Sequence, residues 1–390
     1  MAGDTEGGFL RVAMVCPYDL SRPGGVQGQA MGLARALRRL GHEVLVIAPD
    51  DRPPGSSSGH VVAAGRAWRV PANGSVAPVS LSPFAARRAV ATAREWGADV
   101  VHLHEPLAPV LGYGFVVSRR WPMVGTFHRS GSVGGYVAMR RVARWARARI
   151  DVCTAVSAVA RETALALCGG TDDTYEILGN GVDVDRFSGP QQAEPSDVPA
   201  VLFLGRHEHR KGLGVLLEAF ASVRSPGVLW IAGDGPETQR LRARFPDSGR
   251  VRWLGVLSDD SVRERLTRAK VLCAPSLGGE SFGMVLLEAM AARCRVVASD
   301  IPGYREAAGD HAVLVPPGDA AALAGALDAL LAGTGDVRDL DAGLDAGLDA
   351  GLDHARARSM DRLAVRYVEV YREARRRRTQ GGEAAGPRLA

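Results

Sequence analysis

The sequence predicts an α/β fold of two doubly wound domains that face a central cleft. The chain has 390 residues, which is more than one ordinary domain holds. Hydrophobic residues make up 46% and charged residues 23%, as in a globular protein. Short apolar segments alternate with helical patterns, and this alternation restarts after the polar linker Ser188–Pro199.

The first half of the chain has the pattern of a parallel sheet covered by helices on both faces. The loop Pro17–Gly25 joins the first strand to the helix Val26–Leu40, which Gly41 ends. Helical stretches also separate the later strands, as in βαβ units. The expected strands are Arg11–Cys16, Glu43–Ala48, Val100–Leu103, Pro122–Thr126 and Asp151–Val156.

The same pattern returns in the second half. Helices are expected from Gly214 onward and over Phe282–Ala292. The expected strands are Ala200–Leu204, Val228–Ala232, Val251–Leu254, Val271–Ala274 and Arg295–Ala298. Residues 339–354 repeat the tetrapeptide Asp-Ala-Gly-Leu, and each glycine costs about 1 kcal/mol in a helix. We expect a surface loop or a frayed helix there.

These patterns divide the chain into four parts. Residues 1–190 form the first domain and residues 191–355 the second. A helix over residues 356–378 is expected to return to the first domain. The tail, residues 379–390, is expected to be disordered.

The composition excludes several classes of protein. The apolar stretches are shorter than the ~18–20 residues that cross a bilayer. Residues 1–10 contain Asp4 and Glu6 and lack the apolar core of a signal peptide. The five cysteines form no Cys-x-x-Cys pair, which excludes a disulfide framework or a cysteine-based zinc site. A cytoplasmic protein is therefore expected.

The excess positive charge lies in the first half. Residues 1–190 carry 21 arginines and 16 acidic residues, whereas the remainder carries 27 basic and 27 acidic residues. Between Glu105 and Asp151 there are eight arginines and no acid. This segment is either a solvated helix face or a surface that attracts lipid headgroups or nucleic acid. It lacks a nucleic-acid recognition motif.

Part of this basic segment has the pattern of a helix that lies on a membrane. Four arginines recur there at near-helical spacing between apolar residues. These residues are Arg140, Arg141, Arg144 and Arg147, interleaved with Val137, Val142, Trp145 and Ile150. A buried helix with one basic face has a similar pattern, so both interpretations stay open.

Pro23-Gly24-Gly25-Val26 is the first of three segments suited to phosphate binding. Its glycines let the backbone approach a ligand, and the following helix start offers unpaired N–H groups. The segment is not a dinucleotide fingerprint, because Gly-x-Gly-x-x-Gly and the acidic residue about 20 positions on are missing. A dinucleotide-dependent dehydrogenase is therefore excluded.

The second segment contains two cations at the end of a strand. Gly205-Arg206 follows the strand Ala200–Leu204, and Lys211 comes five residues after Arg206. Ligands of open α/β sheets bind at the carboxyl ends of strands, where these two cations could hold a diphosphate. Lys211 is one of two lysines in a chain with 46 arginines, which favours a specific role.

The third segment, Gly278–Gly283, leads into a helix that contains Glu288. Glu280 and Glu288 are eight residues apart, close to two helical turns, so both can face one side. Backbone N–H groups at this helix start suit a phosphate, and the carboxylates suit sugar hydroxyls. Glu280 in isolation could equally be a first-turn residue favoured by the helix dipole.

Histidines follow two of the expected strands of the first half. His102 and His104 alternate with Leu103, so they share one face of a strand, and His128 follows the next strand. A third ligand of convincing spacing is missing from the sequence. No metal site is therefore expected.

With these residues assigned, the chain resembles the retaining glycosyltransferases of family 4. The Gly-Gly loop, the Arg206–Lys211 pair and the Glu280–Glu288 helix occur in that family's order over residues 11–330. The segments VCPYDLSRPGGVQ, VPANGSVAP, DVVHLHEP, TFH and APSLGGESFG resemble actinobacterial phosphatidyl-myo-inositol mannosyltransferases. The resemblance implies the GT-B fold, with two Rossmann-like domains, an N-terminal one for the acceptor and a C-terminal one for the nucleotide sugar.

The resemblance also implies roles for individual residues. Gly25 would place its backbone N–H on the donor diphosphate, and Arg206 and Lys211 would neutralise the leaving GDP. Glu288 would hold the ribose, and His128 would lie over the sugar and its anomeric carbon. Glu280 would bind the sugar hydroxyls beside the N–H groups of Ser281, Phe282, Gly283 and Met284. Tyr18, Gln27 and Asn73 match positions that line the inositol phosphate pocket.

The implied reaction moves mannose from GDP-mannose to the inositol of phosphatidyl-myo-inositol, or of its mannoside, at the cytosolic membrane face. The implied partners are a nucleotide sugar, a phosphatidylinositol-type lipid and an anionic membrane surface, without nucleic acid. No carboxylate of the motifs is placed as a nucleophile, so front-face substitution is expected. No metal or other cofactor is expected to be required.

The chain departs from the family pattern near the acceptor. The differing positions are Ala72, Pro78, Arg129, Val133 and Asp361-Arg362. Arg129 stands where the family commonly has threonine, and its charge is expected to bind the acceptor phosphate. A soluble acceptor with another nucleotide sugar stays open as an alternative. So does a catalytically idle scaffold that binds nucleic acid or a partner through the basic segment.

Overall fold

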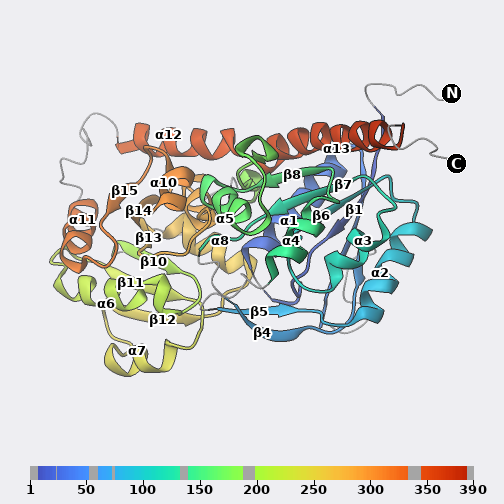
Figure 1. The fold of residues 1–390 in the computed structure, drawn as a ribbon. Helices are drawn as coiled ribbons and strands as arrows, with labels where there is room; N and C mark the ends of the chain where they lie inside the picture. The colour runs from blue at the N-terminus through green and yellow to red at the C-terminus, as the bar shows by residue number, and fades with distance from the viewer. Residues whose placement is uncertain are drawn as a thin grey trace, which may run out of the picture. The chain divides into compact units, whose positions relative to one another are not determined.

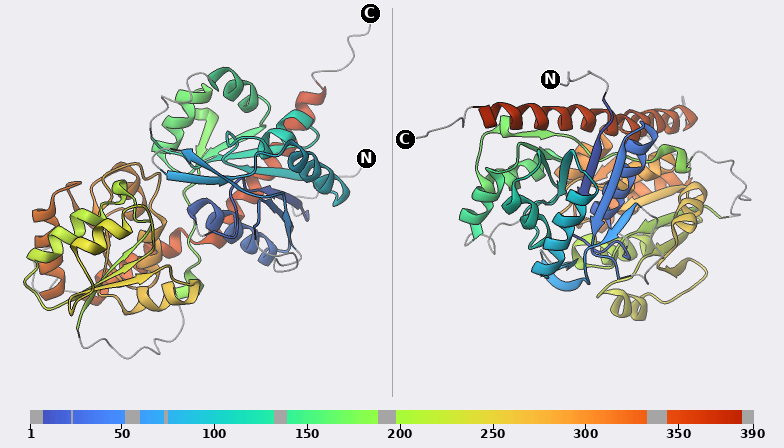
Figure 2. Two further views of the ribbon diagram at one scale, coloured as in Figure 1. Left: turned by 90° about the horizontal axis from the view of Figure 1, so that it is seen from below. Right: turned by 90° about the vertical axis from the view of Figure 1, so that its right-hand side faces the viewer.

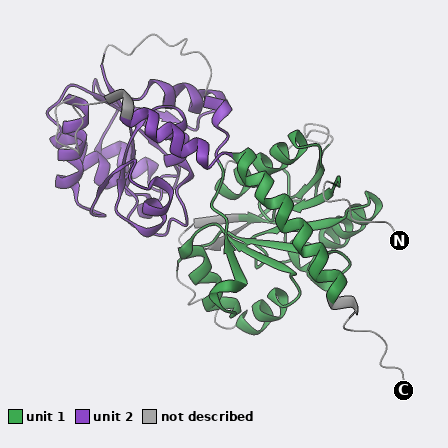
Figure 3. Cartoon of the chain, turned by 90° about the horizontal axis from the view of Figure 1, so that it is seen from above, with its two compact units in different colours: residues 1–181, 360–390 green, residues 182–359 purple. Residues whose placement is uncertain are grey.

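The computed structural model describes residues 8–22, 24–51, 60–72, 75–131, 139–187, 198–332 and 344–383. The chain divides into two compact units (Figure 3). Unit 1 consists of Met1–Gly181 and Met360–Ala390, and unit 2 of Val182–Ser359. The division falls before residue 190, the boundary that the sequence indicated, and residues 188–197 of the expected linker lie outside the described residues.

Unit 1 contains a parallel sheet of seven described strands in the order β3-β2-β1-β6-β7-β8-β9. The strands are β1 (Arg11–Val15), β2 (Glu43–Ala48), β3 (Val61–Ala63), β6 (Val100–His104), β7 (Met123–Phe127), β8 (Val152–Ala155) and β9 (Tyr175–Ile177). A separate antiparallel pair is formed by β4 (Trp68–Ala72) and β5 (Ser75–Val79).

Helices cover both faces of this sheet (Figure 1). On β1, Val12 and Met14 contact the core under α1 (Gly25–Arg39) and α13 (Met360–Glu383), whereas Ala13 and Val15 contact the opposite core. The helices of that opposite face are α2 (Pro83–Glu95), α3 (Leu111–Ser118), α4 (Arg140–Arg147) and α5 (Ala158–Cys168). Burial on both faces is why these strands are apolar runs without alternation.

Unit 2 is likewise built of helices packed around a sheet (Figure 2). Its six described strands are parallel, in the order β12-β11-β10-β13-β14-β15. They are β10 (Ala200–Leu204), β11 (Val228–Ala232), β12 (Val251–Gly255), β13 (Val271–Ala274), β14 (Arg295–Ser299) and β15 (Val313–Val315). The helices are α6 (Leu213–Ser222), α7 (Thr238–Arg244), α8 (Asp259–Arg268), α9 (Met284–Ala291), α10 (Pro302–Ala308), α11 (Ala320–Ala332) and α12 (Leu344–Ala357).

The described part of the tetrapeptide repeat is helical, so the expected loop or frayed helix is wrong there. Residues 344–354 lie in α12, which packs on α9. Leu352 is buried, and a Cβ at Gly351 would lie 3.6 Å from Met290 Cγ. Since α9 provides an apolar partner, tertiary packing outweighs the helix-breaking cost of the glycines.

The carboxy-terminal helix is longer than the sequence indicated. α13 begins at Met360 and continues to Glu383, so residues 379–383 are helical and only residues 384–390 lie outside the described residues. Tyr367 and Tyr371 of this helix are buried against the sheet of unit 1. This packing explains why the helix belongs to unit 1 although it follows unit 2 in the chain.

Candidate active site

In unit 2 the predicted cations and carboxylate lie at the carboxyl end of the sheet. Arg206 follows β10, and Lys211 ends the 3₁₀ helix His209–Lys211. Glu280 lies in the segment between β13 and α9. β10 and β13 are parallel neighbours, so the segments that follow them meet at one edge of the sheet.

Glu280 is bound by two cations. Its Oε1 lies 2.9 Å from Lys211 Nζ and 2.6 Å from Arg210 Nη1. Burial by itself would raise the pKa of Glu280, but the charges and hydrogen bonds of Lys211 and Arg210 outweigh burial and lower it. Glu280 is therefore an ionised carboxylate at neutral pH.

A second carboxylate, Glu208, connects the predicted cation Arg206 to Arg210. Its side chain is only 3% exposed, and it lies 3.2 Å from Arg206 Nε and 3.0 Å from Arg210 Nε. Arg210 therefore bridges Glu208 and Glu280. Sequence reasoning did not assign Glu208 or Arg210, although a single glutamate in the basic segment RHEHRKG was a signal for an internal partner.

The loop before α9 differs from the sequence prediction. α9 begins at Met284, so Glu280, Ser281 and Phe282 precede the helix, and the two-turn spacing argument for Glu280 and Glu288 is wrong. Gly283 is the N-cap with φ 110°, where a Cβ would lie 2.6 Å from Tyr304. Glycine at this position lets the loop fold against α10 and carry Glu280 back toward Lys211.

The remaining predicted donor residues differ in what they offer a ligand. Phe282 is buried in the core, so its side chain does not face solvent and its backbone alone is suited to a ligand. Glu288 lies on α9, where burial raises the pKa of its carboxyl, opposed by Arg186 and assisted by Asp259. A hydroxyl-rich ribose would satisfy such a carboxyl without supplying charge.

In unit 1, Gly25 is the first residue of α1, and Gly24 is its N-cap without a side chain. Gln27 donates to the carbonyl oxygens of Asp19 and Arg22 at 3.2 and 3.4 Å, which holds the loop before the helix. Buried Asp19 supports the same loop by accepting from the Ser21 N–H at 2.9 Å. Hydrogen bonds within the loop before α1 therefore hold the helix start that was predicted to bind the diphosphate.

The structure describes some of the predicted acceptor residues. Tyr18 pairs with Val79 through a β-bridge, and Arg129 follows His128 half-buried. The positive charge of Arg129 acts to lower the pKa of Glu105, although burial raises that pKa overall. Asn73 and Val133 lie outside the described residues.

Three buried histidines of unit 1 are brought together at the carboxyl ends of β6 and β7. His104 Nδ1 lies 2.9 Å from His128 Nε2, and His102 Nε2 lies 2.7 Å from Thr126 Oγ1. Burial lowers the pKa of His102 and of His128 to about 3 and that of His104 well below its ordinary value. Within the described residues, no three His, Cys, Asp or Glu side chains are grouped as metal ligands.

We expect these buried imidazoles to make unit 1 acid-labile. In the unfolded chain they titrate near pH 6.5, whereas in the folded chain His102 and His128 stay neutral to about pH 3, and burial also lowers the pKa of His104. Below about pH 6.5 the unfolded state therefore binds more protons, and the free energy of unfolding falls by up to about 1.4 kcal/mol per pH unit for each imidazole.

Urea unfolding followed between about pH 7.5 and pH 4.5 measures this slope. His102→Asn should flatten this slope, because it removes one of the buried imidazoles. A wild-type unfolding free energy that stays constant over this range would contradict the assignment of neutral histidines.

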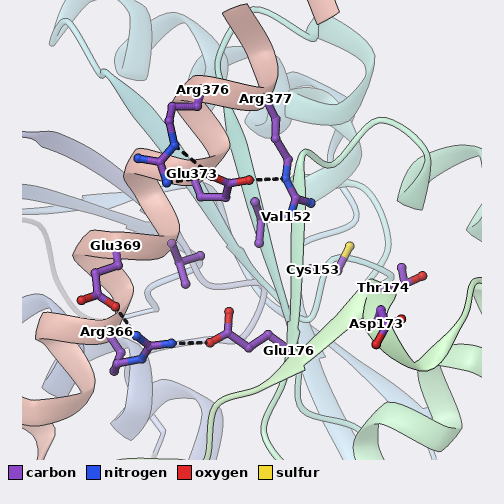
Figure 4. A pocket seen from close by; sticks show the side chains of 11 residues that line it. Val152, Cys153, Asp173, Thr174, Glu176, Arg366, Glu369, Glu373, Arg376 and Arg377 are labelled. Carbon is purple, nitrogen blue, oxygen red and sulfur yellow. Dashed lines mark hydrogen bonds and ion pairs between the residues drawn. The ribbon is translucent and has the colours of Figure 1, made fainter. Parts of the chain in front are cut away.

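A cavity of about 240 Å³ in unit 1 lies away from these residues (Figure 4). It is lined from the amino end of β8 and from α13, and it contains none of the predicted site residues. Figure 4 shows Arg366 turned toward Glu176, at 2.8 Å, and Arg377 turned toward Glu373, at 2.7 Å. Because these charges are paired and burial raises the pKa of Cys153 to about 12, the cavity has no evident chemistry.

Comparisons with known proteins match both halves of the chain. Residues 23–186 match the family described as "Glycosyltransferase Family 4", and residues 198–333 match "Glycosyl transferases group 1". The phosphatidyl-myo-inositol mannosyltransferase of Mycolicibacterium smegmatis is 41% identical, covering 83% of this chain and 85% of that protein. A GDP-mannose-dependent alpha-mannosyltransferase of Mycobacterium tuberculosis is 31% identical, covering 80% of this chain and 85% of that protein.

Solved structures confirm the predicted α/β fold. Sucrose-phosphate synthase from Thermosynechococcus elongatus superposes with a TM-score of 0.72 at 22% identity, covering 93% of this chain and 98% of that chain. The two parallel-sheet units are those of the GT-B fold. Sequence and fold together show that the chain belongs to glycosyltransferase family 4, in the family of the phosphatidyl-myo-inositol mannosyltransferases.

Proposed function

We propose that this chain is a retaining mannosyltransferase that moves mannose from GDP-mannose to the inositol of phosphatidyl-myo-inositol, or of its mannoside. The observation that carries the proposal is the ion-pair cluster in which Arg210 and Lys211 bind Glu280, and Arg206 and Arg210 bind Glu208. It combines cations for a diphosphate with an ionised carboxylate for sugar hydroxyls. The names of the mannosyltransferase relatives indicate the sugar, the nucleotide and the lipid acceptor that we propose.

The chemistry we propose is front-face substitution. The bond between the anomeric carbon and the β-phosphate oxygen breaks, and the inositol oxygen bonds to that carbon on the same face. The inositol proton passes to the leaving phosphate. Negative charge grows on GDP during bond breaking, so the protein's contribution is electrostatic stabilisation by Arg206, Lys211 and the N–H groups at Gly25.

Lys211 has to change partners during this reaction. In the ligand-free structure its ammonium group binds Glu280 at 2.9 Å. A diphosphate is a stronger attractor than one carboxylate, so Lys211 would turn to the phosphates. Arg210 would remain on Glu280, which keeps the carboxylate ionised and oriented toward the mannose hydroxyls. Glu288 would bind the ribose, and no metal ion is needed in this scheme.

For the acceptor we propose a site in unit 1 formed by Tyr18, Gln27, Asn73 and Arg129. The first turn of α1 carries no acidic residue, which suits the phosphate of an inositol lipid. Arg129 adds a cation next to His128. His128 is proposed to lie over the mannose, between the donor and acceptor groups.

We propose that the protein acts at the inner face of the cell membrane and binds it peripherally through α4. Ala143 and Ala146 of this helix are buried, whereas Val142 and Trp145 are 42% and 39% exposed beside exposed Arg141 and Arg144. This combination of exposed apolar and basic side chains suits an anionic bilayer. In the described part of the chain, no helix is long and apolar enough to cross a membrane.

Neutralising Arg141 and Arg144 as glutamines should weaken binding to phosphatidylinositol vesicles by about 2 kcal/mol, or about 30-fold, at low salt. Vesicle sedimentation measures this. The matched control replaces Arg87 and Arg88 of α2, which lie exposed near the 74% exposed Phe84. If the α2 variant loses binding and the α4 variant keeps it, the assignment to α4 is wrong.

Transfer of labelled mannose tests the function itself. GDP-mannose is supplied with phosphatidylinositol vesicles in one reaction and with soluble inositol phosphate in another. Label that enters the lipid supports the proposal. Label that enters only inositol phosphate would replace the lipid with a soluble acceptor, which the departure at Arg129 would explain. No consumption of GDP-mannose would contradict the proposed donor.

A further inference from the structure

The three buried histidines of unit 1 form a stack. The ring centroids of His102 and His104 are 4.3 Å apart, and those of His104 and His128 are 5.2 Å apart, both at an interplanar angle of 27°. His102 is fixed by hydrogen bonds to Thr126 Oγ1 at 2.7 Å and to the Tyr371 hydroxyl at 2.9 Å. The backbone N–H of His128 is held by Glu105 at 3.0 Å. The His104 ring therefore lies between two anchored rings.

One hydrogen bond connects His104 to His128. It joins His104 Nδ1 and His128 Nε2 at 2.9 Å. Burial disfavours the charged form of both rings, so at neutral pH each imidazole carries one proton. One ring must then donate and the other accept. The choice fixes the tautomer of both rings, since each neutral imidazole has one N–H and one bare nitrogen.

The other nitrogen of His104 decides between the two arrangements. His104 Nε2 is buried and has no hydrogen-bond partner among the described residues. If His128 donated, His104 Nε2 would carry a proton and be a buried N–H without an acceptor. If His104 donates, Nε2 is a bare nitrogen that lacks a donor. Among buried backbone groups an unpaired N–H is rarer than an acceptor without a donor, and the same preference in an imidazole favours the second arrangement.

We propose that His104 is a positioning residue that donates its Nδ1–H to His128 Nε2 and thereby holds His128 with its proton on Nδ1. The Nδ1–H is then the one ring donor that His128 can offer to a substrate. This step rests on the proposed function: the Nδ1–H of His128 donates to a hydroxyl oxygen of the transferred mannose. The stack with His102 keeps the His104 ring in the orientation that this hydrogen bond requires.

Nitrogen-15 NMR of the imidazole rings in the ligand-free protein tests the tautomer directly. The ring signals of His128 are assigned by their loss in His128→Gln. We expect the proton of His128 on Nδ1 and that of His104 on Nδ1. A proton on Nε2 of His128 would overturn the proposal. This readout does not depend on activity, so it stands or falls separately from the proposed mannosyl transfer.

Two variants of His104 test its positioning role. His104→Leu removes the donor and should lower kcat on the order of 100-fold while GDP affinity stays unchanged, because misplaced catalytic groups slow the chemical step. His104→Asn should restore most of this loss, since the asparagine amide nitrogen, like Nδ1, is attached to Cγ. Wild-type kcat in His104→Leu would contradict the role.

The matched control is His42→Leu, which removes a histidine of unit 1 whose Nδ1 accepts from the Leu10 N–H at 3.3 Å. It should keep wild-type kcat. If His104→Leu does not fold, the proposal is decided by His104→Asn, in which the proton of His128 should remain on Nδ1. A shift of that proton to Nε2 in the asparagine variant would also count against it.

Discussion

Replacing Lys211 with alanine is expected to lower kcat for mannosyl transfer by about 100–1000-fold. Loss of one group that stabilises a developing anion costs about 3–4 kcal/mol in the transition state. Lys211 is suited to this role because it ends a short helical turn directly before α6 and lies 22% exposed. Gly212, with φ 69°, makes that position possible, since a Cβ there would lie 1.9 Å from the Pro275 carbonyl oxygen.

The measurement is single-turnover transfer from GDP-mannose together with GDP binding by calorimetry. Lys270→Ala is the matched control, because Lys270 is the other lysine of the chain and donates to the Leu331 carbonyl at 2.8 Å. It precedes β13, so it lies at the amino end of the sheet that has Lys211 at its carboxyl end. Full turnover in Lys211→Ala would remove Lys211 from the reaction.

Replacing Glu280 with glutamine is expected to separate sugar transfer from nucleotide binding. Transfer should fall on the order of 100-fold, because a neutral amide binds the sugar hydroxyls more weakly than a carboxylate. GDP affinity should rise, because Lys211 and Arg210 both bind Glu280 in the ligand-free protein and its charge competes with the diphosphate. The two parameters therefore move in opposite directions.

The experiment measures the transfer rate and the GDP affinity of Glu280→Gln separately. GDP titration by calorimetry gives the affinity, and initial rates with GDP-mannose give kcat and KM. Glu237→Gln serves as the control, since Glu237 is paired with Arg240 at 2.8 Å in the same unit. A fall of GDP affinity in Glu280→Gln, in parallel with the rate, would contradict the competition between Glu280 and the diphosphate.

The two predictions depend on a cluster that the sequence assigned only in part. Arg206, Lys211 and Glu280 were assigned because Gly-Arg and Lys-Gly follow a strand and because the family order was recognisable. Glu208 and Arg210 were not assigned, since no periodicity predicts an ion pair between two residues of an irregular loop. Their roles follow from Glu208 being buried and bonding Arg210 at 3.0 Å.

The argument that assigned Glu280 to the site from its spacing is also wrong. A helical spacing to Glu288 was inferred, but α9 begins at Met284 and Glu280 precedes it. Gly283 has a non-helical φ of 110°, so α9 begins only after it, and a Cβ at this position would lie 2.6 Å from Tyr304. Helix starts are set by such local turns and by packing from other segments, which the apolar pattern does not contain.

The α/β class, the two parallel sheets, most strand positions and the family can all be predicted from the amino-acid sequence. These follow from local hydrophobic patterns and short motifs, which need no knowledge of distant contacts. The part of α12 that continues the tetrapeptide repeat was not determined, because its helix depends on burial against α9.

Only the tertiary structure placed His102, His104 and His128 in one stack and tied His102 to Tyr371, a residue 269 positions away. Only the tertiary structure placed Lys211 and Arg210 on Glu280, about 70 positions away. β6 and β7 are parallel neighbours, as are β10 and β13, so residues at and after their carboxyl ends meet, whereas Tyr371 is brought in by the packing of α13 on the sheet. The order of strands in a sheet and the packing of a distant helix are both decided by non-local contacts.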